Sequence, residues 1–128
     1  MKTILSNEFL QATILHKGAE LCSLKTLEKE YIWNGNPQFW GKHSPILFPI
    51  VGTLINNSYE FENQYFELAR HGFARDMNFE LISNTGSQAS FLLANNADTI
   101  LVFPCVIFFI ACIATMLLSS YLDLVFAK

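Results

Sequence analysis

Charged side chains are scarce in this sequence and nearly absent from its last quarter. Asp, Glu, Lys and Arg make up 15% of the 128 residues, against about 25% in an average soluble domain. Residues 1–98 hold 17 of the 19 charged side chains, whereas residues 99–128 hold only Asp123 and Lys128. This split excludes a uniform composition and predicts two parts with different structures.

Basic patches and paired cysteines are also lacking. The formal net charge is −3 and the pI is near 5.5, so there is no cationic stripe to bind phosphates and we expect no nucleic-acid partner. Cys22, Cys105 and Cys112 are odd in number and contain no CxxC pair, which argues against a disulfide framework and a zinc site. The apolar stretch after Lys2 is too short for a signal peptide, so we expect a cytoplasmic protein.

Residues 1–98 also lack a long stretch with the apolar spacing of a helix. Apolar residues come instead in short runs bounded by Gly, Asn and Pro, which is the pattern of strands and turns. Residues 58–68 predict a hairpin that turns at Asn63-Gln64, and residues 78–82 and 89–93 predict a second hairpin. Further strands are expected on both sides of Gly18 and at 31–33. Seven or more short strands without a long helix predict an all-β fold.

Three segments resemble, in this order, the aldose 1-epimerase family of sugar mutarotases. They are GAELCSLK with YIWNG at 18–35, FWGKHSPILFPIVGTL at 39–54, and LARHGFARDMNFEL at 68–81. The similarity runs from about residue 3 to about residue 104 and is greatest to the LacX-type branch of galactose-mutarotase-like proteins. It implies that residues 1–104 form the N-terminal portion of that family's β-sandwich (supersandwich), with an aldose as substrate and no cofactor or metal.

Mutarotation requires a general base and a general acid, because it deprotonates the anomeric hydroxyl and protonates the ring oxygen. The resemblance implies that both catalysts, a Glu and a His, lie beyond residue 104. It makes His71, in the HG motif, similar to a histidine that contacts the substrate beside them, and His71 is our catalytic candidate. Arg75, Arg70 and His43 are the candidates for binding the sugar. Thr53 stands where many relatives have Arg, which argues against a phosphorylated sugar.

Each candidate also has a purely structural interpretation. His71 could cap a turn, His43 could hydrogen-bond within its loop, and Arg75 could form a surface ion pair with Asp76 that contributes under about 1 kcal/mol. Trp40 could stack on a sugar ring, but aromatic residues at this density more often belong to a core. The HGFAR motif favours the binding role for His71 and Arg75, and we expect it to meet the loop at 39–45 in one site.

Residues 99–122 are 24 consecutive positions without a charge, which as a helix would cross a membrane core of about 30 Å. Because the resemblance ends near Cys105, we treat residues 105–128 as a separate apolar tail, for which a helix is one expected conformation. A shifted reading frame is our preferred explanation of this tail, and a membrane anchor and a buried segment are the alternatives. Membrane contact is expected only through residues 99–122.

The leading hypothesis is an aldose 1-epimerase-like, carbohydrate-binding protein that lacks mutarotase activity as a truncated chain. The alternative is a non-catalytic sugar-binding or vestigial β-domain that its tail tethers to a membrane. A structural fragment without a ligand is the third hypothesis.

Overall fold

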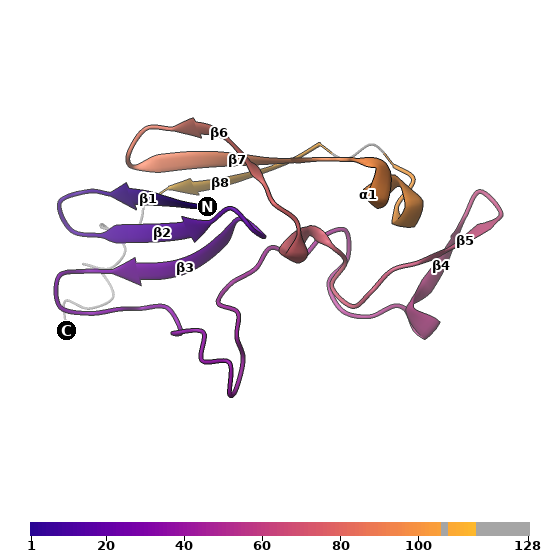
Figure 1. Cartoon of the computed structure of the whole chain (residues 1–128), viewed down its shortest axis with the longest axis horizontal. Helices are drawn as coiled ribbons and strands as arrows, with labels where there is room; N and C mark the ends of the chain where they lie inside the picture. Colours follow the sequence, from indigo (N-terminus) through magenta and orange to yellow (C-terminus); the bar gives the residue numbers. More distant parts are fainter. Residues whose placement is uncertain (106–107, 115–128) are drawn as a thin grey trace.

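The computed structural model describes residues 1–105 and 108–114, the latter as backbone. Within these residues the chain forms eight strands, one short α-helix and two 3-10 turns (Figure 1). The strands are β1 (Lys2–Ser6), β2 (Gln11–Leu15), β3 (Glu20–Lys25), β4 (Ser58–Phe61), β5 (Gln64–Glu67), β6 (Glu80–Asn84), β7 (Gln88–Ala94) and β8 (Phe108–Ala114). The helix is α1 (Ala97–Val102), and the 3-10 turns are η1 (Ile55–Asn57) and η2 (Ala74–Asp76). The expected all-β fold is confirmed.

The first sheet has the strand order β1-β2-β3, and its strands pair antiparallel. Thr3 and Leu5 of β1 and Ala12 and Ile14 of β2 are buried, whereas the residues between them are more exposed. Successive side chains of a strand point to opposite faces, so this alternation gives the sheet one apolar face.

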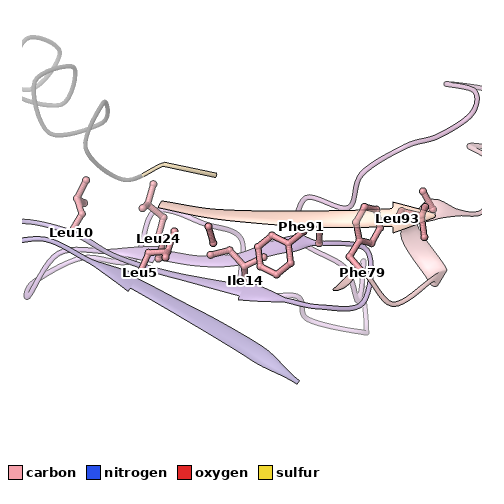
Figure 2. Close-up of a cluster of buried hydrophobic side chains, with 11 residues drawn as sticks. Leu5, Leu10, Ile14, Leu24, Phe79, Phe91 and Leu93 are labelled. Atoms are coloured by element: carbon pink, nitrogen blue, oxygen red, sulfur yellow. The ribbon is translucent and has the colours of Figure 1, made fainter. Parts of the chain in front are cut away.

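The second sheet, β6-β7-β8, faces the first, and alternate side chains of its strand β7 are buried. Ala89, Phe91 and Leu93 of β7 are buried, and Phe91 lies between β7 and the first sheet beside Ile14 (Figure 2). The rings of Phe91 and His16 pack in a T-shaped arrangement, with 5.4 Å between ring centroids. The two apolar faces together form the core of a sandwich.

A hairpin formed by β4 and β5 projects from one end of the sandwich, next to α1 (Figure 1). Tyr59 of β4 stacks on Phe66 of β5 at 5.5 Å between ring centroids, and its hydroxyl donates a 2.9 Å hydrogen bond to the carbonyl of Val102. Phe103, directly after α1, contacts the rings of Phe48 and Phe73 at 6.1 and 6.5 Å. Aromatic contacts therefore fasten the hairpin and α1 to two irregular segments of the chain.

Two details of the predicted strands are wrong. Residues 31–33 form no strand: pairing with β3 stops after a bridge between Glu30 and Lys25 and a 2.8 Å hydrogen bond from the Tyr31 amide to Leu24, and the amide of Ile32 donates to the Glu30 carboxylate at 3.0 Å. The hairpin predicted at residues 58–68 turns at Glu62-Asn63, one residue earlier than predicted, since Phe61 pairs with Gln64. Both turn residues have positive φ, 51° and 60°, which is the geometry that tight two-residue hairpins require.

A continuous helix over the apolar residues 99–122, one of the alternatives for the tail, is not formed within the described part of the chain. The helix α1 ends at Val102, and residues 108–114 form β8, which pairs with β7 along its whole length. This stretch, FFIACIA, is rich in the aromatic and β-branched residues that favour strands. In the described ranges, no helix is long and apolar enough to cross a membrane. The other positions of the tail, 106–107 and 115–128, lie outside the described residues.

Candidate functional site

An open pocket of about 460 Å³ lies where a loop at residues 40–47 meets a turn at residues 70–75. Its lining residues come from these two segments: Trp40, Lys42, Ser44, Pro45, Leu47, Arg70, His71 and Arg75. The expected meeting of the 39–45 loop with the HGFAR motif is thus confirmed. Three of the four candidate residues, Arg70, His71 and Arg75, share this pocket.

Backbone hydrogen bonds hold the two segments together. The carbonyl of Phe48 accepts the amides of Phe73 and Ala74 at 3.0 and 3.2 Å, and the amide of His71 donates to the carbonyl of Gly52 at 2.8 Å. The loop and the turn therefore share hydrogen bonds as strands would, although each is irregular. This pairing fixes the walls of the pocket.

The pairing depends on an unusual backbone conformation in the HG motif. His71 and Gly72 both have a φ of 68°, a left-handed conformation that glycine adopts without strain and other residues rarely adopt. A side chain at position 72 would also overlap the carbonyl of Phe48. Glycine at position 72 therefore meets two independent constraints.

The imidazole of His71 is held by the opposite segment. Its Nδ1 accepts the amide of Gly52 at 2.9 Å, and its Nε2 lies 3.1 Å from Nε of Arg70. A neutral imidazole has only one nitrogen with a lone pair. The backbone amide of Gly52 cannot turn away, so it takes the lone pair of Nδ1, and the proton resides on Nε2. In the structure Nε–H of Arg70 is directed at Nε2, so Nε2 donates to a ligand oxygen only after the Arg70 side chain has turned away.

His71 stays neutral at pH 7. Desolvation lowers the pKa of its imidazole below the ordinary value of 6.5, and the positive charges of Arg70 and Arg75 lower it further. Protonation would also put a second proton on Nδ1 and break the hydrogen bond from Gly52. The pocket therefore stabilises the tautomer that donates from Nε2.

Asp76 joins two cations of the pocket wall. Nζ of Lys42 donates to Oδ1 of Asp76 at 3.0 Å, and Nε of Arg75 lies 3.3 Å from Oδ2. The hydrogen bond from Lys42 is the main reason that the pKa of Asp76 lies below 3.8. Nε of Arg75 is buried and lacks an aligned hydrogen-bond acceptor among the described residues, so its contact with Asp76 is electrostatic.

His43 is not among the residues that line the pocket. Its amide donates to Glu20 at 2.6 Å, its Nδ1 lies 3.8 Å from the same carboxylate, and its ring packs against Gly35. The neighbouring Lys42, which residue type alone did not single out, lines the pocket instead. Trp40 is half-exposed and also lines the pocket, so it does not belong to the core.

Metal binding has no support in the part of the chain that the structure describes. No group of three or more His, Cys, Asp or Glu side chains is arranged there to hold a metal ion. The charged side chains that line the pocket are cationic, and they would repel a metal ion.

The model of the aldose 1-epimerase family matches residues 1–107 of the chain. The chain is also 34% identical over 100 residues to protein LacX of Lactococcus lactis subsp. lactis, in both its plasmid and its chromosomal form. The matched part covers 73% of this chain and 33% of LacX. The chain thus spans about a third of the length of these relatives.

Two solved structures have the same fold as the described chain. The galactose mutarotase related enzyme of Lactobacillus acidophilus has a TM-score of 0.88 and 36% identity, over 91% of this chain and 39% of that one. The galactose mutarotase-like protein of Lactobacillus casei ATCC 334 has a TM-score of 0.85 and 32% identity, over 89% and 40%. The expected galactose-mutarotase-like sandwich is therefore confirmed for this part of the fold.

We expect Gly72→Ala to destabilise the fold more than Gly86→Ala. Both glycines have positive φ, 68° and 88°, so each substitution has a backbone cost of about 1–2 kcal/mol. An added Cβ has open space at Gly86 but overlaps the carbonyl of Phe48 at Gly72, so we expect a total of about 3 kcal/mol or more there. Urea unfolding measures both, and equal losses would contradict the steric role of Gly72.

The lowered pKa of His71 predicts a specific pH dependence of stability. As pH falls, the unfolded chain binds a proton on this imidazole near pH 6.5, before the folded chain does, so the free energy of unfolding decreases from that pH down to the folded pKa. His71→Asn keeps an acceptor for Gly52 and tolerates positive φ, but does not titrate. Urea unfolding between pH 5 and 8 should show a shallower decrease in this variant. Identical profiles would refute the assignment.

Proposed function

The chain belongs to the aldose 1-epimerase family, and we propose that it binds an aldose sugar in the pocket between residues 40–47 and 70–75. The observation that carries this proposal is the placing of Trp40, His71 and Arg75 around one open pocket. An indole face, an imidazole N–H and a guanidinium suit a pyranose, which has apolar C–H faces and a rim of hydroxyls.

The three groups have distinct roles in this proposal. Trp40 stacks on the sugar ring, and its half-exposed side chain leaves a face open to the ligand. Nε2 of His71 donates to a hydroxyl or ring oxygen, because Gly52 fixes the proton there. Arg75 donates from its guanidinium to two neighbouring oxygens, a geometry that lysine does not offer. Arg70, beside His71, contacts the sugar from the same wall.

We further propose that this chain does not accelerate mutarotation by a large factor. The side chains that line the pocket include an imidazole, two guanidiniums and an ammonium, but no carboxylate. Cations of this kind cannot accept the anomeric proton, and Nδ1 of His71 is already occupied by Gly52. Positioned acid and base groups each contribute about 100- to 10,000-fold to such a reaction, so a pocket without a base supports binding rather than catalysis.

Fluorescence titration tests the binding proposal. Trp33→Phe leaves Trp40 as the single tryptophan and removes the hydrogen bond from the Trp33 indole to the Trp40 carbonyl, so every variant is compared within this background. D-glucose or D-galactose should change the Trp40 emission in a saturable way. Adding Arg75→Met removes charge-assisted hydrogen bonds of about 1.5–3 kcal/mol, so we expect an affinity about 10- to 100-fold lower. Lys29→Met, at an exposed position outside the pocket lining, is the matched control. An unchanged Trp40 signal at high sugar concentration would exclude the pocket as a sugar site.

Polarimetry tests the catalytic part of the proposal. Freshly dissolved α-D-glucose or α-D-galactose should reach equilibrium with this chain at close to the solvent rate. His71→Asn is the comparison, since it removes the one imidazole in the pocket. If equilibration accelerates in proportion to protein and His71→Asn abolishes the acceleration, the proposed absence of a base is wrong.

A further inference from the structure

The loop that carries Trp40 is fastened to the rest of the fold at several places. At its start, the indole N–H of Trp33 donates to the carbonyl of Trp40 at 2.9 Å. Toward its C-terminal end, the Ser44 hydroxyl donates to the carbonyl of Leu21 at 2.8 Å, and the amide of His43 donates to Glu20 at 2.6 Å. Both contacts tie the loop to β3. On the pocket side, the salt bridge from Lys42 to Asp76 ties the loop to η2, 34 residues later in the chain.

Asp76 therefore connects the two halves of the pocket wall. Its Oδ1 accepts Nζ of Lys42, and its Oδ2 lies 3.3 Å from Nε of Arg75. Lys42 and Arg75 both line the pocket, whereas Asp76 itself does not. Among the described side chains, no other carboxylate forms an ion pair with either cation.

The exposure of these side chains indicates that their ion pairs position the pocket wall more than they stabilise the fold. About half of the Asp76 side chain is exposed, as is about a third of the Lys42 side chain. Exposed ion pairs of this kind contribute little to the free energy of folding. Their geometric effect is larger, because without Asp76 two like charges would face each other on one wall and would repel.

We propose that Asp76 is a positioning residue of the sugar pocket: its carboxylate holds Lys42 and Arg75 side by side and thereby sets the spacing between Trp40 and the Arg75 guanidinium. This inference rests on the proposed function, since it assigns Asp76 to the same sugar site. Asp76 does not touch the sugar. It acts through the two cations and through the loop that Lys42 holds in place.

A double-mutant cycle tests the inference. Asp76→Asn keeps the shape of the side chain and removes its charge, and we expect it to weaken sugar binding about three- to tenfold with little change in unfolding. Adding Lys42→Met removes one of the two repelling cations, so the double variant should regain part of the lost affinity. Added salt should also reduce the defect of Asp76→Asn, because it screens the repulsion. Glu60→Gln, an exposed carboxylate on β4, is the matched control and should bind as the parent does.

A second measurement does not depend on sugar binding. In the Trp33→Phe background, iodide quenches Trp40 according to the charge around it, whereas neutral acrylamide reports exposure alone. Asp76→Asn should increase quenching by iodide more than quenching by acrylamide, since the cations near Trp40 lose their counterion.

The outcomes separate the two proposals. A parent chain that binds no sugar refutes the proposed function. Iodide quenching of Trp40 then still shows whether Asp76 offsets the positive charges of Lys42 and Arg75. If the parent binds sugar and Asp76→Asn binds equally well, Asp76 has no positioning role, although the sugar site stands. An additive loss of affinity in the double variant, with no rescue and no salt effect, also overturns the positioning role.

Discussion

The carbonyl of Phe48 is the group on which the pocket depends. It accepts two amides from the turn at Phe73 and Ala74, and a parallel bridge joins Phe48 to Gly72. These contacts bring a proline-rich loop and the HG turn to within backbone hydrogen-bonding distance, where neither segment has a regular partner of its own. Because buried backbone groups must be satisfied, the loop cannot move away without losing several hydrogen bonds at once. The side chains of the pocket are thus placed by backbone pairing.

The charges of the pocket follow from this placement. Arg70 and Arg75 lie close enough to His71 to lower its pKa, and the amide of Gly52 then determines which nitrogen carries the proton. The same cations would repel one another without a counterion, and Asp76 supplies it from outside the lining. One arrangement therefore has two consequences. The backbone amide of Gly52 determines which nitrogen of the neutral His71 carries the proton, and the carboxylate of Asp76 orders the side chains of Lys42 and Arg75.

The strands could largely be predicted from the sequence, whereas the site could be predicted only in part. The short apolar run at 89–93, which follows turn residues, predicted β7, and the structure buries one face of that strand. The irregular loop has no such period, so nothing in the sequence indicated that Lys42 rather than His43 lines the pocket. The meeting of the loop with His71 came from resemblance to a family, since spacing in sequence does not encode a contact between distant turns. The strand predicted at residues 31–33 is absent for a local reason: after the Tyr31 amide has paired with Leu24, the next amide, that of Ile32, donates to the Glu30 carboxylate instead of to β3.

Binding and proton transfer make opposite demands on a sugar site, and the described side chains of the proposed site suit only the first. Hydroxyls and ring oxygens accept hydrogen bonds from guanidiniums, an ammonium and an imidazole N–H, and the lining provides all of these. Removing the anomeric proton needs an acceptor of suitable pKa within hydrogen-bond reach. The carboxylate that pairs with two lining cations, Asp76, has a pKa below 3.8, so it is a weak base. The features that make this wall a good donor surface are therefore those that prevent it from acting as a base.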